Sequence, residues 1–210
     1  MELSTWLIYS AVAGLAIISP GPAILLAVSN GLTLGLRRTI YSSAGNITGL
    51  FVIACIAMVG LGAVLKTSAS VFLFVKIAGA AYLIYIGITQ WRAKTTMFSP
   101  NNVNTQSISY SKFQLLNRGF LVALSNPKSI LFFTALFPQF INSSGSFLPQ
   151  FLTLTCTFMV MSFISLMAYA YLARSAQTWF SNDNRVNWFN RTTGGGFILI
   201  GLGLLRLKSV

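Results

Sequence analysis

Long apolar runs separated by short polar stretches dominate the pattern of this chain. A run of about 20 apolar residues is long enough to cross a hydrocarbon core of about 30 Å, because a helix rises 1.5 Å per residue. Such runs predict helices near residues 4–30, 40–65, 70–91, 117–141, 148–173 and 192–207. The pattern therefore predicts an all-α integral membrane protein with six transmembrane helices.

One stretch, residues 95–111, breaks the apolar pattern for long enough to be a linker. It is rich in Asn, Ser and Thr, and it contains Pro100. Such a composition is typical of a loop in water. The chain is thereby divided into a first three-helix unit over residues 1–94 and a second over 112–210, which together form a single membrane domain.

Composition agrees with the membrane assignment. The chain has 55% hydrophobic and 8% charged residues, whereas soluble proteins average about 25% charged residues. The net charge of +12 raises the alternative of a nucleic-acid partner. The cations, however, are scattered singly between apolar runs, and no reader motif accompanies them, which argues against nucleic-acid binding.

The cations predict the orientation of the helices. If the loops after the first, third and fifth helices share one side, that side holds nine cations: Arg37, Arg38, Arg92, Lys94, Lys112, Arg118, Arg174, Arg185 and Arg191. The other side holds Lys66, Lys76, Arg206 and Lys208. Excess Lys and Arg mark the cytoplasmic face, so we expect the 95–111 linker in the cytoplasm and both termini on the periplasmic side.

Two internal similarities predict a repeat. The segment Ser19–Leu26, SPGPAILL, aligns without a gap with Ser125–Phe132, SNPKSILF. A second pair, Gly79–Ile84 and Gly194–Leu199, follows in the same order. Since each unit has three spans, the second copy enters the membrane from the opposite side. The expected architecture is an inverted repeat of three plus three helices, an arrangement found in secondary transporters.

Prolines interrupt the first helix of each expected repeat. Pro20 and Pro22 lack the N–H of a regular helix, and Gly21 between them is permissive, so the helix should break there. Pro127 predicts a matching break. Open backbone at membrane depth is tolerated where it lines a cavity or is buried in protein. A packing kink is the simpler alternative, but the matched pair favours a substrate cavity between the repeats.

Lys128 is the candidate binding residue that stands out. It lies about ten residues into the fourth predicted helix, and a charge at that depth costs about 2.5–3.5 kcal/mol. The only acids are Glu2 and Asp183, both outside the predicted spans. A substrate carboxylate would complement the ammonium, helped by Asn126 and by backbone freed at Pro127. Snorkelling, or capping of carbonyls at the first break, are the alternatives.

The motifs resemble the lysine exporter and homoserine/threonine efflux superfamily. The resemblance rests on SPGP at residues 19–22, GNITG at 45–49, KIAGAAYLIYIGITQWR at 76–92 and NPKSILFFTALFPQF at 126–140. It covers nearly the whole chain. It implies six helices, a homodimer and export of small amino acids or their derivatives from the bacterial cytoplasm across the inner membrane. Within that frame we expect substrate binding at Lys128, Asn126, Ser19 and Gly21, and helix breaks or gating at Pro20, Pro22, Pro127, Gly45 and Gly49.

Two positions depart from the pattern of that superfamily. Many relatives carry an acid just after the second glycine of helix two, here Leu50, or in the middle of helix five, here about Ser162. The chain also has no His. The usual titrating groups of proton antiport are therefore missing from these positions.

Three other functions compete with amino-acid export. A related family of thiol electron carriers places cysteines beside these prolines, but Cys55 and Cys156 lie elsewhere and are expected to pack as small hydrophobes. A metal-ion permease lacks enough ligands, and no metal or other cofactor is expected. A non-transporting membrane binding module stays open. The expected function is thus transport rather than catalysis, with a small neutral amino acid as substrate and lipid as solvent.

Overall fold

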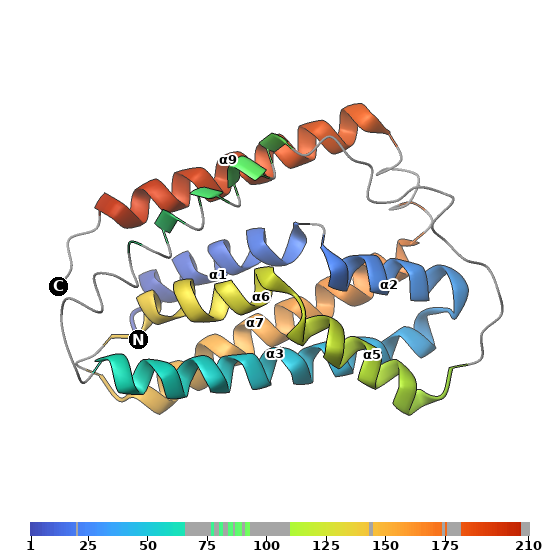
Figure 1. The fold of residues 1–210 in the computed structure, drawn as a ribbon, viewed down its shortest axis with the longest axis horizontal. Helices are drawn as coiled ribbons and strands as arrows, with labels where there is room; N and C mark the ends of the chain where they lie inside the picture. The colour runs from blue at the N-terminus through green and yellow to red at the C-terminus, as the bar shows by residue number, and fades with distance from the viewer. Residues whose placement is uncertain are drawn as a thin grey trace.

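A computed structural model describes the protein over residues 1–19, 21–65, 77, 80, 81, 84, 85, 87–89, 91, 92, 110–142, 145–173, 175 and 182–206. Within these residues the regular structure is helical throughout, which confirms the all-α prediction there (Figure 1). The helices are α1 (Leu3–Ile18), α2 (Pro22–Thr33), α3 (Leu36–Leu65), α5 (Lys112–Leu124), α6 (Pro127–Leu131), α7 (Phe147–Tyr171) and α9 (Asp183–Arg206), with a π-helix η2 (Phe132–Leu136) and a 3-10 helix η3 (Phe137–Phe140).

Two of the described helices are long and apolar enough to cross a membrane, α3 over Leu36–Val59 and α7 over Phe147–Tyr171. Two bent pairs pass the same test when each is counted as one span, α1 with α2 and α5 with the segment Pro127–Phe140. The described residues thus supply two to four candidate spans. The expected count of six is not confirmed and stays a prediction.

Both bent pairs break where the sequence predicts a break. The α1–α2 pair bends by 57° and the α5–α6 pair by 55°. Gly21 is extended, with φ −167° and ψ −177°, and Pro22 is the first residue of α2. Pro127 likewise is the first residue of α6. Pro20 lies outside the described residues. A proline at the first helical position sacrifices no intrahelical hydrogen bond, so each chain resumes its helix there.

The two bent pairs run in opposite directions beside each other. Tyr9, in the first half of α1, contacts the ring of Phe140 at the end of the second pair, with ring centroids 5.2 Å apart. At the breaks, Ser19 contacts Lys128. Rising residue numbers in one pair therefore meet falling numbers in the other. This antiparallel arrangement brings the two breaks together in the middle of the protein (Figure 1).

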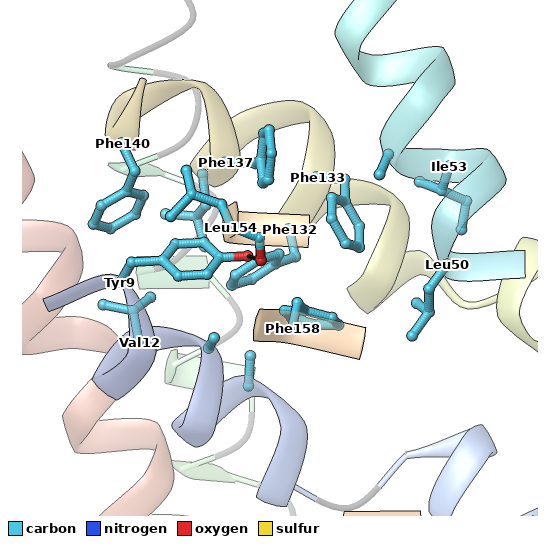
Figure 2. Close-up of a cluster of buried hydrophobic side chains, with 14 of the residues drawn as sticks. Tyr9, Val12, Leu50, Ile53, Phe132, Phe133, Phe137, Phe140, Leu154 and Phe158 are labelled. Atoms are coloured by element: carbon cyan, nitrogen blue, oxygen red, sulfur yellow. Dashed lines mark hydrogen bonds between the residues drawn. The ribbon is translucent and has the colours of Figure 1, made fainter. Parts of the chain in front are cut away.

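An aromatic cluster holds the bent pairs against α7. Figure 2 shows the ring of Tyr9 surrounded by side chains of the second bent pair, and its hydroxyl donates to the Leu154 carbonyl at 3.0 Å. This bond satisfies the one polar atom of a side chain that is otherwise buried among apolar groups. The rings packed in this cluster are Phe132, Phe133, Phe137, Phe140, Phe151 and Phe158.

Helices α3 and α5 pack backbone to backbone along a seam of small residues. A Cβ atom on Gly45 would lie 1.9 Å from the Leu116 carbonyl oxygen, and one on Gly119 would lie 1.8 Å from the Ser42 carbonyl oxygen. Only glycine permits that approach. Gly49 continues the seam, since a Cβ there would lie 2.6 Å from the Ala123 Cβ. The seam fixes α5, and hence the break that follows it, against α3.

The helix ends fall into two groups. The end of α7 and the starts of α3, α5 and α9 lie at the right of Figure 1, whereas the N-terminus, the start of α7 and the end of α9 lie at the left. Lys112 at the start of α5 contacts Tyr41 in the first turns of α3, with its ammonium 5.4 Å from the centre of the Tyr41 ring. Arg37, Arg38 and Arg185 belong to the same end. The prediction of orientation assumed this grouping, in which the loops after the first, third and fifth predicted helices share one side.

Several helix boundaries differ from the predictions. The last helix begins at Asp183 rather than near 192, because the Asn182 side chain accepts from the Arg185 N–H at 3.2 Å and starts the helix early. The fourth predicted helix, 117–141, begins at Lys112 and changes to π and 3-10 geometry from Phe132 onward. Pro138 cannot donate an N–H to the preceding turn, which accounts for the irregular winding.

Two predicted segments fall largely outside the description. The linker 95–111 is described only from Tyr110, and the helix 70–91 only at single positions from Ile77 onward. Those positions are helical and meet α9: a Cβ on Gly87 would lie 2.7 Å from the Gly194 carbonyl oxygen. The division into units at 1–94 and 112–210 stays a prediction.

Candidate functional site

Lys128 lies at the meeting point of the two breaks. It is the second residue of α6, and its backbone N–H donates to the Asn126 side chain at 3.1 Å. Its side chain is partly buried and reaches across to the first bent pair, where the ammonium donates to the Ser19 carbonyl at 2.6 Å. One of the two alternatives weighed for this lysine, capping of a carbonyl at the first break, is thus present in the structure.

The break after α1 leaves the carbonyls of Ile18 and Ser19 without helical donors. In a continuous helix the Ile18 carbonyl would accept from residue 22, but Pro22 has no N–H. The extended Gly21 then turns the chain away before the carbonyl of Ser19 can find its own partner. Tyr169 on α7 donates its hydroxyl to the Ile18 carbonyl at 3.0 Å, and Lys128 takes the Ser19 carbonyl. Side chains from two other elements therefore satisfy these two carbonyls.

Electrostatics favour a cation at this place. The C-terminal end of a helix carries partial negative charge from its free carbonyls, and α1 ends at Ile18, directly before the carbonyl that Lys128 contacts. Carboxylate support, by contrast, is absent from the site. Glu2 stands at the opposite end of α1, and Asp183 is the first residue of α9. The Lys128 ammonium is therefore held by a carbonyl and a helix end rather than by an ion pair.

A narrow cavity of about 30 Å³ surrounds this contact. Polar side chains line it beside the lysine: Asn46, Asn126, Ser129, Ser162 and Ser165. The apolar lining comprises Ala16, Ile17, Gly21, Ala23, Ile24, Leu50, Phe132, Phe158 and Leu166. A volume of that size holds about one or two water molecules. The cavity beside Lys128 is thus too small for an amino acid in this structure.

The start of α2 adds backbone donors to the cavity wall. Ala23 and Ile24 follow Pro22 in the first turn, where the geometry of a helix leaves N–H groups without intrahelical acceptors. Both residues line the cavity. Together with Lys128, they give the cavity a wall suited to an anion and, at the carbonyl end of α1, a second wall suited to a cation.

Most of the predicted site residues come together here. Lys128 and Asn126 line the cavity beside Gly21, where a Cβ atom would lie 3.4 Å from the Lys128 ammonium nitrogen. Ser19 contributes its carbonyl rather than its hydroxyl. Pro22 and Pro127 start the two half-helices and are placed as expected.

Gly45 and Gly49 lie differently from the other predicted residues. They are inside the continuous helix α3, which does not break at either glycine, and they serve the close approach to α5. A part for them in gating stays a prediction. Between them, Asn46 faces the cavity and its amide lies 3.5 Å from the Gly119 carbonyl. Its signal in the sequence was a lone amide within an apolar run, next to a glycine.

Two further lining residues were noted in the sequence for another reason. Leu50 and Ser162 are the positions at which many members of the resembled superfamily carry an acid, and both line the cavity with Lys128. Tyr169 was missed. Nothing in its local sequence separates it from other aromatic residues of an apolar helix, since its partner, the Ile18 carbonyl, is 151 positions away.

The cysteines and the metal ligands do not form a second site in the described part of the chain. Cys55 is partly buried and packs against the aromatic cluster, as expected. Cys156 is exposed on α7, so the prediction that it packs in the core is wrong. Among the described residues no group of three His, Cys, Asp or Glu side chains could hold a metal ion.

A larger cavity of about 720 Å³ lies between α1, α7 and α9. Its lining is mainly apolar, including Ile17, Ile164, Ala168, Leu172 and Trp188. Carboxylate and ammonium groups would meet no charged side chain among these lining residues. The smaller cavity at Lys128 is therefore the better candidate for a polar ligand.

Comparison with known proteins points to transport. A family model described as LysE type translocator matches residues 15–208. The homoserine/homoserine lactone efflux protein of Salmonella typhimurium is 35% identical over 201 residues, which is 96% of each chain. A leucine efflux protein of an Enterobacter species is 30% identical over 77% of this chain and 78% of its own.

One further relative matches the chain over its full length. An uncharacterized membrane protein of Vibrio cholerae is 34% identical over 209 residues, the whole of both chains. No solved structure matches the chain significantly. The similarity to these proteins thus covers both bent pairs and the cavity between them.

Proposed function

Because the chain belongs to the LysE type translocator family, we propose that it is a secondary transporter that exports small neutral amino acids, or close derivatives, across the bacterial inner membrane. Two relatives carry the names of efflux proteins, one for homoserine and its lactone and one for leucine. Homoserine and leucine differ in their side chains, but both are zwitterions whose side chain carries no charge. The family resemblance noted in the sequence is confirmed.

The observation that carries the proposal is Lys128 in the cavity between the two broken spans. Its ammonium has no carboxylate partner, because the two acids of the chain lie elsewhere. A substrate carboxylate would supply the missing negative charge, and the free N–H groups of Ala23 and Ile24 would add donors. Asn126, which caps α6, keeps the backbone of Lys128 in place for this contact.

The rest of the lining favours a neutral substrate. Ile24, Leu50 and Leu166 provide apolar surface, and Ser129 and Ser162 provide hydroxyls for a polar side chain such as that of homoserine. A lysine or arginine side chain would bring a further positive charge close to Lys128 with no acid to compensate it. We therefore place the substrate in the homoserine/threonine class, with leucine as the apolar extreme.

Transport requires the narrow cavity to widen. Its volume of about 30 Å³ is well below what an amino acid needs, so the half-helices must move apart to admit one. The breaks at Pro22 and Pro127 are the natural hinges, because no helical hydrogen bond crosses them. On this account the alternating opening of the two bent pairs exposes Lys128 first to the cytoplasm and then to the periplasm.

The wider architecture belongs to the same proposal. The two bent pairs, with similar bends and opposite directions, are the leading helices of an inverted repeat of three plus three spans. The cation-rich ends near Arg37 and Lys112 face the cytoplasm. The protein works as a homodimer in the inner membrane, as the family resemblance implies.

An efflux assay tests the proposal directly. Cells that express the protein are loaded with labelled homoserine, threonine, leucine and lysine, and the label that leaves is compared with that from cells carrying the Lys128→Gln variant at equal membrane abundance. We expect faster loss of at least one neutral amino acid from cells with the native protein, and no gain for lysine. Efflux of all four amino acids no faster than from cells that lack the protein would refute the function and favour a binding module.

A further inference from the structure

The carbonyl end of α1 holds a cation in this structure, and that cation is the ammonium of the protein's own Lys128. Ile18 and Ser19 offer two adjacent carbonyls that no helical N–H reaches, because Pro22 and the extended Gly21 end the helix pattern. Tyr169 fills the first through its hydroxyl, and the Lys128 ammonium fills the second at 2.6 Å. This is a built site for an ammonium group.

A free amino acid carries the same group. Its α-ammonium has three N–H donors, as the ammonium of lysine does, and it lies next to the carboxylate. We propose that the carbonyl end of α1 is the subsite for the α-ammonium of the substrate, and that Lys128 occupies this subsite as a tethered stand-in until a substrate arrives. The inference rests on the proposed function, because it presumes that an amino acid binds at Lys128.

The exchange conserves charge within the cavity. The substrate carboxylate draws the Lys128 ammonium away from Ser19, and the substrate ammonium takes the carbonyl that Lys128 leaves. Two ammonium groups cannot share this carbonyl, because they would repel strongly at such a distance in a medium of low dielectric constant. A zwitterion brings no net charge, so the protein needs no acidic side chain to bind it, in agreement with the absence of acids from the lining residues.

The subsite imposes a requirement on ligands. A molecule with a carboxylate but no ammonium can displace Lys128 but leaves the Ser19 carbonyl without a donor. An amine without a carboxylate must compete with Lys128 for this carbonyl and provides no negative charge for the displaced Lys128 ammonium. Only a ligand that carries both groups satisfies both partners, so N-acylated amino acids and simple amines are poor substrates.

Removing the lysine should strengthen the binding of simple amines, which compete poorly with Lys128 in the native protein. In Lys128→Met the Ser19 carbonyl is vacant, so 3-amino-1-propanol, which is homoserine without its carboxylate, should bind at least about tenfold more tightly than to the native protein. L-homoserine should bind at least about tenfold more weakly, because its carboxylate has lost the lysine. If L-leucine is exported better, the pair becomes L-leucine and 3-methylbutylamine.

The experiment measures both ligands by calorimetry on purified, detergent-solubilised protein. Lys112→Met is the matched control, because Lys112 is an exposed cation at the start of α5, outside the cavity. Neither affinity should change in this control. Weakened binding of L-homoserine to Lys128→Met with no gain for the amine would overturn the ammonium subsite and leave the proposed function intact. Failure of the native protein to bind any amino acid would overturn both.

The native protein provides a test that needs no variant at the site. N-acetyl-L-homoserine keeps the carboxylate and lacks the ammonium, so it should bind at least about tenfold more weakly than L-homoserine. Equal affinity of the two ligands would contradict the subsite even if the Lys128→Met protein did not fold.

Discussion

Replacing Gly119 by alanine should destabilise the protein by about 1–2 kcal/mol. The new Cβ atom would lie 1.8 Å from the Ser42 carbonyl oxygen and 3.0 Å from the Asn46 nitrogen. Both partners are backbone atoms of α3 and cannot rotate away, so α3 and α5 must move apart. Such overpacking costs about 1–3 kcal/mol. The better helix propensity of alanine returns about 0.5–1 kcal/mol of that cost.

Gly203 provides the matched control for this substitution. It also lies in a helix, α9, but a Cβ atom there would meet nothing within 4 Å among the described residues outside its own helix. Gly203→Ala should therefore stabilise the protein by about 0.5–1 kcal/mol through helix propensity alone. Thermal unfolding of the purified variants in detergent micelles should give changes of opposite sign. If Gly119→Ala were as stable as Gly203→Ala, the close contact between α3 and α5 would be refuted.

The same substitution reaches the cavity. Asn46 on α3 and Asn126, in the break that follows α5, both line it, and the seam sets the spacing between α3 and α5. Moving the two helices apart would change the shape of a cavity whose volume is only about 30 Å³. Export per molecule of membrane-inserted protein should therefore fall in Gly119→Ala, and it should be unchanged in Gly203→Ala.

Three further predictions follow from the site and the topology. Gly21→Ala should lower export without unfolding the protein, because extended backbone accepts any residue while the new methyl group would lie 3.4 Å from the Lys128 ammonium nitrogen; unchanged efflux would contradict the site. Changing Cys55 and Cys156 together to Ala should leave export intact, whereas complete loss at normal abundance would revive a thiol mechanism. In that cysteine-free background, Cys at Ser146 should be labelled by a membrane-impermeant maleimide from outside the cell, and Cys at Asn184 only after lysis; the reverse pattern would overturn the orientation.

The central features of the site were predictable because they follow from local chemistry. A proline cannot donate an N–H, so the SPGP and NPK segments had to open the helix wherever they lay. A lysine within an apolar run, in a chain with two distant acids, had to seek a carbonyl or a ligand. Two contacts of Lys128 follow from those facts: its backbone N–H donates to Asn126, which caps α6, and its ammonium donates to the Ser19 carbonyl.

Features that depend on distant parts of the chain could not be predicted in this way. The glycines of GNITG suggested a break, but whether a glycine bends a helix or lets another helix approach is decided by its neighbour, here Leu116. Tyr169 has no local signal, because its partner lies on α1. The early start of α9 depends on one cap at Asn182, which hydrophobic periodicity does not detect.

The central claim is that Lys128 reads the carboxylate of an exported amino acid. It is tested most directly by comparing the affinity of the native protein and Lys128→Gln for L-homoserine and for its carboxamide. In the native protein the carboxamide should bind about ten- to a hundredfold more weakly, since a charge-assisted hydrogen bond contributes about 1.5–3 kcal/mol. In Lys128→Gln the two ligands should bind almost equally. The same discrimination against the carboxamide in both proteins would contradict the account and move the carboxylate site to the backbone donors at Ala23 and Ile24.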